Sequence, residues 1–123
     1  MNLNSRLQGN VLILAPQGRI DHTSSEAFSA ALEPYLAECK SGGTPVVLDF
    51  CGTEYISSIG LRALMLAARQ VKAQNGHIVI AAPPQTLREV LEVSRFNLIY
   101  RIFDSVGAAV TSLSLADIEP KPR

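Results

Sequence analysis

Two adjacent serines, Ser57 and Ser58, precede a glycine and a run of apolar residues with helical spacing. Serine hydroxyls at the start of a helix have two uses. They cap the helix by accepting a hydrogen bond from an unpaired backbone amide, which contributes about 1 kcal/mol. They can also receive a phosphate group, whose negative charge the helix N-terminus stabilises. Residue types alone favour the cap, and both uses stay open at this point.

Two loops carry polar side chains where functional groups are usually found. They run from Arg19 to Ser25 and from Cys51 to Gly60, and each leads from an expected strand into an expected helix. Because sites in α/β proteins gather at the carboxyl ends of strands, we expect both loops at one edge of the sheet. The candidate residues of the first loop are Asp21, His22 and Thr23.

The motifs of common enzyme classes are missing from the sequence. It has no GxGxxG or GxxxxGK[ST] phosphate-binding loop, and Ser58 lacks the flanking glycines of a nucleophile elbow. His22 could act as a base, but no triad pattern surrounds it, and we interpret it as a solvated loop residue. The carboxylates Asp21, Asp49 and Glu54 lack histidine partners at ligand spacing. We therefore predict no catalytic residue, no metal site and no cofactor.

Strands and helices alternate along the chain. Apolar runs predict strands at 11–14, 46–50 and 77–82, and the first follows a hairpin turn at Gly9-Asn10. Apolar residues at helical spacing predict helices after Thr23, near Gly60, after the prolines at 83 and 84, and after residue 104. The segment 98–103 reads as a short edge strand.

Capping residues mark two of these helices. Thr23 and Glu26 have the spacing of a capping box, and Asp104 is the expected cap of the last helix. The order of elements predicts a single-domain α/β fold with a four- to five-stranded mixed sheet, an N-terminal hairpin and about four helices. We expect the domain to span residues 1–116 and residues 117–123 to form a flexible tail.

The composition predicts a globular protein of one domain. Of its 123 residues 47% are hydrophobic, and eleven basic residues balance eleven acidic ones. This balance argues against direct binding to nucleic acid or an anionic membrane, which needs a basic surplus. The first apolar run, 11–15, is too short for a signal peptide or membrane span, so we expect a cytoplasmic protein. Cys39 and Cys51 are then expected as free thiols.

The segment 46–67, "VVLDFCGTEYISSIGLRALMLA", resembles the signature segment of STAS domains, the anti-sigma factor antagonist family. In that family an apolar strand leads through an Asp-Phe or Asp-Leu pair and an aromatic residue to I-(D/S)-S-x-G-L and a helix. "GRID" at 18–21 is similar to the first signature loop of the family, and 90–110 is similar to its C-terminal region. The resemblance extends across nearly the whole chain and implies the STAS fold.

The resemblance also implies a regulatory binding protein rather than an enzyme. In phosphorylatable members, the serine two residues before the glycine receives phosphate from a kinase that is also an anti-sigma factor. That position is Ser58 here, with Ser57 as the second choice, while Ile59 is bulkier than the small residue usual in the family. The implied partners are an anti-sigma factor that is a serine kinase and a PP2C-type phosphatase. Partner switching of this kind regulates transcription, and we expect a monomer or weak dimer.

The implied partner-binding surface combines the two loops with the start of the helix that follows Gly60. Arg62 lies one turn beyond Ser58 on the same helical face and could pair with a phosphate there. The residues expected at this surface are Asp21, His22, Thr23, Tyr55, Ser57, Ser58, Ile59, Gly60 and Arg62. Two alternatives stay open: a non-phosphorylated STAS scaffold in a lipid-transport or stress-signalling assembly, and a small enzyme or nucleotide-binding domain.

Overall fold

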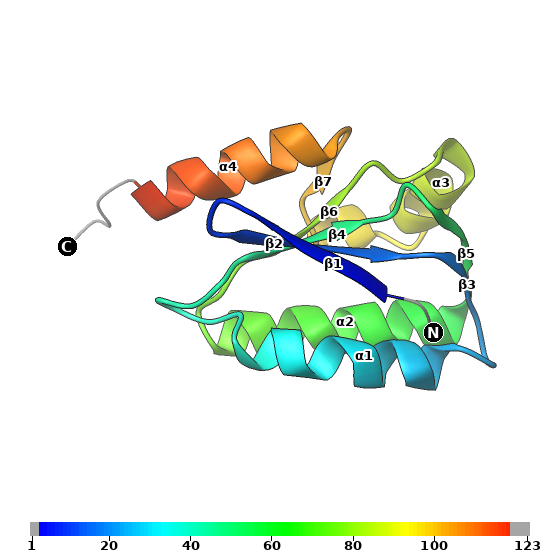
Figure 1. Ribbon diagram of the computed structural model, residues 1–123. Helices are drawn as coiled ribbons and strands as arrows, with labels where there is room; N and C mark the ends of the chain where they lie inside the picture. The colour runs from blue at the N-terminus through cyan, green and yellow to red at the C-terminus, as the bar shows by residue number, and fades with distance from the viewer. Residues whose placement is uncertain (1–2, 119–123) are drawn as a thin grey trace.

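The protein folds as a mixed five-stranded sheet with helices on both faces (Figure 1). The computed structural model describes residues 3–118, and the side chains as far as residue 114. The strands are β1 (Leu3–Gln8), β2 (Val11–Pro16), β3 (Gly18–Ile20), β4 (Val46–Asp49), β5 (Thr53–Ile56), β6 (Ile78–Ala81) and β7 (Ile102–Phe103). The helices are α1 (Ser25–Ala37), α2 (Ser58–Ala73), α3 (Gln85–Val93), the 3₁₀ turn η1 (Phe96–Leu98) and α4 (Val106–Ile118).

The large sheet has the strand order β1-β2-β4-β6-β7. β1 and β2 form an antiparallel hairpin, and Gly9 in its turn adopts a positive φ of 64° that glycine accommodates without steric cost. The remaining neighbours, from β2 to β7, are all parallel. This arrangement confirms the predicted α/β fold with a mixed sheet and an N-terminal hairpin.

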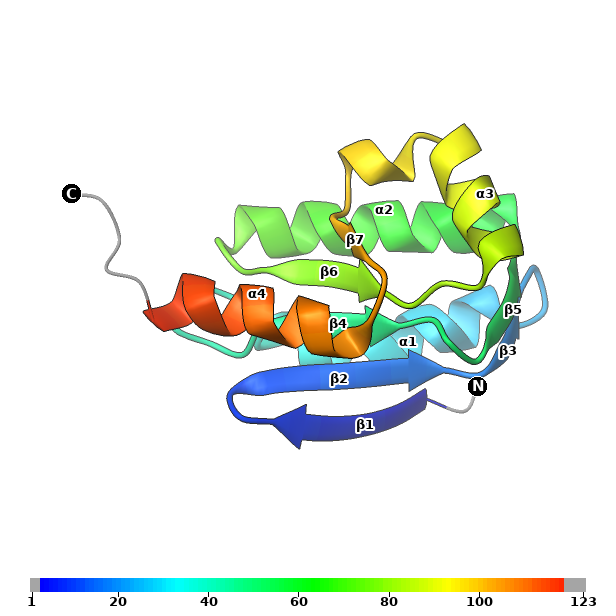
Figure 2. The same ribbon diagram turned by 90° about the horizontal axis from the view of Figure 1, so that it is seen from above.

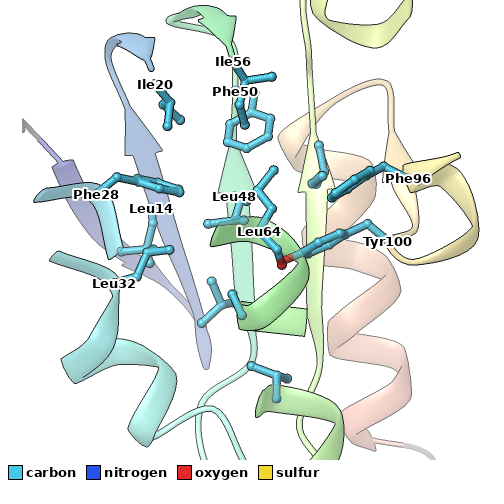
Figure 3. Close-up of a cluster of buried hydrophobic side chains, with 14 of the residues drawn as sticks. Leu14, Ile20, Phe28, Leu32, Leu48, Phe50, Ile56, Leu64, Phe96 and Tyr100 are labelled. Carbon is cyan, nitrogen blue, oxygen red and sulfur yellow. The ribbon is translucent and has the colours of Figure 1, made fainter. Parts of the chain in front are cut away.

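The sheet has an apolar core on each face. Helices α1 and α2 cover one face, and α3, which contacts β5 at the end of the sheet, adds Leu87 and Leu91 to the same core. Figure 3 shows Leu14, Leu48 and Leu64 among the side chains of this core. Helix α4 covers the other face and packs on Ile13 and Val47, the alternate residues of the same strands. Strands buried on both faces read as continuous apolar runs, which is why they were predictable from the sequence.

A second, two-stranded sheet was not predicted. β5 lies inside the segment 51–60 that the sequence suggested as a loop, and it pairs in parallel with β3. Only its end residues, Thr53 and Ile56, are buried, so the segment lacks the alternation that identifies a half-buried strand. The buried Thr53 hydroxyl donates a hydrogen bond to the Pro16 carbonyl at 2.9 Å and ties this sheet to the end of β2.

Both predicted helix caps were wrong. Helix α1 begins after Ser24, and the Thr23 hydroxyl donates to Asp21 Oδ1 at 2.6 Å instead of capping. At α4 the Ser105 hydroxyl accepts the Ala108 amide at 3.1 Å. The expected cap of α4, Asp104, instead accepts a hydrogen bond from the guanidinium of Arg88 at 2.7 Å. In both places a neighbouring side chain replaces the helix amides as the hydrogen-bond partner: the Asp21 carboxylate accepts from Thr23, and the Arg88 guanidinium donates to Asp104.

The edge strand is shorter than the predicted 98–103. Arg95 adopts a left-handed conformation with φ 61° after α3, and the chain then forms η1 before β7. β7 therefore contains only Ile102 and Phe103. Helix α4 extends two residues beyond the expected domain boundary at 116, and residues 119–123 of the expected tail lie outside the described residues. Within residues 3–118, every helix is too short or too polar to cross a membrane.

Candidate functional site

The small β3–β5 sheet brings the two polar loops together. Ile20 and Ile56 are register partners at the ends of β3 and β5, so the residues that follow them emerge side by side. The Ser57 amide donates to the Ile20 carbonyl at 2.8 Å and joins the two loops directly. The loops thus share one edge, as the sequence predicted, but the edge belongs to this second sheet.

The two serines occupy different positions at the start of α2. Ser57 is the N-cap, in an extended conformation, and its hydroxyl accepts a hydrogen bond from the Gly60 amide at 3.2 Å. Ser58 is the first helical residue and is exposed, and its hydroxyl bonds to no described residue. The capping use therefore falls to Ser57, which leaves the neighbouring hydroxyl accessible to another molecule.

Gly60 is buried in the first turn of α2, against the end residues of β3 and β5. A Cβ atom there would lie 2.7 Å from Cγ1 of Ile56 and 2.9 Å from both Cγ2 and the backbone oxygen of Ile20. The glycine thus allows the first turn of α2 to approach both strand ends. Its place in the site is to hold the serines close to the first loop, because it exposes no side chain.

Asp21 organises the first loop. Its Oδ1 accepts hydrogen bonds from the Thr23 hydroxyl at 2.6 Å and the Thr23 amide at 3.0 Å, and its Oδ2 lies 3.5 Å from Nε of Arg19. The Ser24 hydroxyl donates to the Arg19 carbonyl at 2.7 Å and accepts the Asp21 amide at 3.0 Å. The loop is therefore held by its own side chains and is ordered before any partner arrives.

These hydrogen bonds favour the ionised carboxylate and lower the pKa of Asp21 from 3.8 to about 2, with the Thr23 hydroxyl the largest cause. Because the pKa of Asp21 is lower in the folded protein, the ionised carboxylate stabilises the fold above pH 3.8, and this stabilisation is lost as the pH falls through about 2.

We expect the NMR resonance of the Thr23 amide to titrate with a midpoint near pH 2. Thr23→Val, which removes the hydroxyl donor, should move the midpoint upward. An ordinary midpoint in the unmodified protein would contradict this assignment.

Arg19 and Tyr55 link the two strands on the exposed side of the small sheet. They are register partners, and the Arg19 guanidinium lies 4.4 Å from the centre of the Tyr55 ring. Such a contact contributes about 0.5–1 kcal/mol at an exposed position. Sequence reasoning named Tyr55 but missed Arg19, because only the pairing of β3 with β5 brings the two residues into contact.

Most of the expected site residues are exposed, and the exposed ones include apolar and charged side chains. The Ile59 side chain is 50% exposed and that of Tyr55 40%, while His22, Thr23 and Arg62 are also exposed. Arg62 makes no ion pair with any described residue. Among the side chains that the structure describes, residues 3–114, no group of three His, Cys, Asp or Glu has the arrangement of a metal site. Such a surface can bind a protein and accept a modification at its exposed hydroxyl.

Comparisons with known proteins agree with this architecture. The family model of the STAS domain matches residues 2–109. The chain is 34% identical over 106 residues to BtrV of Bordetella bronchiseptica, a protein named as an anti-sigma factor antagonist, and the match covers 86% of this chain and 89% of BtrV.

Solved structures show the same fold. An anti-sigma factor antagonist from Mycobacterium paratuberculosis is similar at a TM-score of 0.80 and 17% identity, over 90% of this chain and 92% of that one. The Bacillus cell fate determinant SpoIIAA in its phosphorylated form is similar at a TM-score of 0.65 and 16% identity, over 91% of this chain and 99% of that one. The family model and the identity to BtrV establish that this chain belongs to the STAS domain family, the family of the anti-sigma factor antagonists.

Proposed function

We propose that the protein is an anti-sigma factor antagonist that binds a kinase-type anti-sigma factor and releases it when Ser58 is phosphorylated. The single observation that carries this proposal is the division of roles at the start of α2. Ser57 provides the cap, and the exposed hydroxyl of Ser58 has no structural partner among the described residues. The protein is then the substrate of a kinase and of a PP2C-type phosphatase, and is not itself an enzyme.

Relatives support the proposal in two ways. BtrV, which shares 34% identity with this chain, is named as an anti-sigma factor antagonist. SpoIIAA, which has the same fold, exists in phosphorylated and unphosphorylated forms. Phosphorylation of a protein with this fold is therefore compatible with an intact domain.

The helix N-terminus explains why a phosphate at Ser58 leaves the domain folded. The phosphate adds roughly −1.5 to −2 charges at neutral pH, next to the unpaired amides of the first turn of α2. Arg62 is one turn away on the same face and is free to pair with the phosphate. Both effects stabilise the modified helix, so the switch acts on the surface presented to the partner.

Replacing the hydroxyl tests the modification site. With the cognate kinase and ATP, we expect one phosphate per molecule in the unmodified protein and none in Ser58→Ala, measured by intact mass spectrometry. Ser57→Asn is the matched control because asparagine retains a capping oxygen but has no hydroxyl to phosphorylate. It should still receive one phosphate. Normal phosphorylation of Ser58→Ala, or its loss in Ser57→Asn alone, would move the site to the neighbouring serine.

A further inference from the structure

A groove of about 820 Å³ lies along the open half of β6, at the edge of the large sheet. β7 pairs only with Ile80 and Ala81, so the first half of β6 has no neighbouring strand on that side. Figure 2 shows the short β7 beside the end of β6, and α2 and α4 on either side of that strand. Ile78 and Val79 line the groove, together with residues of both helices and Leu98 and Ile99 near η1.

The backbone of β6 presents hydrogen-bonding groups to this groove. The amides of Ile80 and Ala82 point toward β7 and donate to the carbonyls of Arg101 and Phe103, at 3.0 and 2.8 Å. Backbone groups alternate along a strand, so Ile78 directs its amide and carbonyl to the same side. No described loop residue accepts the Ile78 amide. An open strand edge of this kind is a template for pairing with another extended chain.

The charged residues that line the groove are all basic. Arg69, Lys72 and Arg101 line it, none of its lining residues is acidic, and these three cations make no ion pair with any described residue. The Arg101 guanidinium lies over the Phe103 ring, 4.9 Å from its centre, and is held ready to bind a carboxylate. Leu98 is 76% exposed and Ile99 45% exposed, which adds an apolar rim to the cationic one.

We propose that this groove binds an extended acidic segment of a partner protein, which pairs with β6 as an added strand. Successive side chains of such a strand would face α2 and α4 in turn. Those that face α2 meet Arg69 and Lys72 and are acidic, whereas those that face α4 meet Leu113 and are apolar. Main-chain hydrogen bonds then supply affinity, and the cations supply specificity.

This occupant fits better than the chain's own last residues. These contain two basic residues, Lys121 and Arg123, against one acidic residue, Glu119, and two prolines that lack an amide for strand pairing. The groove is also separate from the Ser58 surface. Arg69, the nearer of the two α2 cations, lies 11 residues after Ser58, about 16 Å along the helix axis, so both surfaces can be occupied together.

The test uses a heptapeptide of alternating valine and glutamate as the probe, with the ¹⁵N-labelled full chain observed by NMR. We expect the largest shift changes at the amide of Ile78, and roughly tenfold weaker binding of the peptide with lysine in place of glutamate. N-methylation of alternate peptide amides removes strand pairing without changing the protein, and should also weaken binding about tenfold.

Charge reversal in the groove completes the test. The double variant Arg69→Glu, Lys72→Glu should prefer the lysine peptide, because the charge on this side of the groove is reversed. Both positions are exposed, so they can be changed without disturbing the core. Arg6→Glu, on β1 at the opposite edge of the sheet, is the matched control and should leave the preference unchanged. Three results would overturn the proposal. The N-methylated peptide could bind as tightly as the unmethylated one, the shift changes could occur at β1 instead of β6, or no peptide could bind at millimolar concentration. None of these results bears on phosphorylation at Ser58.

Discussion

Ser58→Asp is expected to weaken binding of the anti-sigma factor kinase about a hundredfold, a loss of about 2.8 kcal/mol, and to leave the melting temperature unchanged. The position is exposed on the first turn of α2, so a carboxylate there is tolerated by the fold and favoured by the helix dipole. A partner that covers the position must desolvate the charge, which costs several kcal/mol where no cation on the partner pairs with it. Calorimetric titration of the partner, together with thermal denaturation, measures both quantities.

Ser105→Asp provides the matched control for this substitution. Ser105 caps α4, and aspartate caps as well as serine, so the change adds the same charge at another helix start. It should alter neither partner binding nor stability. If Ser58→Asp binds as tightly as Ser105→Asp, the partner does not cover the start of α2. The protein would then fit the alternative of a non-phosphorylated scaffold.

The large sheet was predictable because its strands and the helices that cover it are each recognised from short, continuous stretches of sequence. β2, β4 and β6 are continuous apolar runs, and the helical spacing of α2 gives an apolar stripe whose buried members include Leu64 and Val71. A turn residue marked the boundary between β1 and β2, where Gly9 has a φ of 64°. The order of these elements was enough to predict the fold class.

The site was less predictable because it depends on contacts between segments that are distant in the sequence. The pairing of β3 with β5 involves three residues of one strand and four of the other, too few for a periodic signal. That pairing brings the Arg19 guanidinium over the Tyr55 ring and lets the Ser57 amide donate a hydrogen bond to the Ile20 carbonyl. Assigning the cap to Ser57 required the first residue of α2 to be known, since a shift of one residue exchanges the roles of the two serines.

Gly60→Ala is expected to lower the free energy of unfolding by about 2 kcal/mol and the melting temperature by roughly 8 °C. The added methyl carbon would lie 2.9 Å from the backbone oxygen of Ile20 and 2.7 Å from Cγ1 of Ile56, and the backbone oxygen cannot rotate away. In an ordinary helix the same substitution stabilises by up to about 1 kcal/mol, so a net loss isolates the packing effect. Urea denaturation of the two proteins gives the difference directly.

Gly107→Ala is the control that shows whether the close approach of α2 to β3 causes the stability loss expected for Gly60→Ala. Gly107 is in the first turn of α4, and the nearest atom to an added Cβ is 4.0 Å away, so this variant should be as stable as the unmodified protein or slightly more so. Equal stability of Gly60→Ala and Gly107→Ala would show that α2 does not need its close approach to β3.

The expected difference between the two variants has a functional consequence as well. Relief of the clash moves the start of α2 away from the Ile20 carbonyl that holds the Ser57 amide, so Gly60→Ala should also slow phosphorylation at Ser58, whereas Gly107→Ala should not.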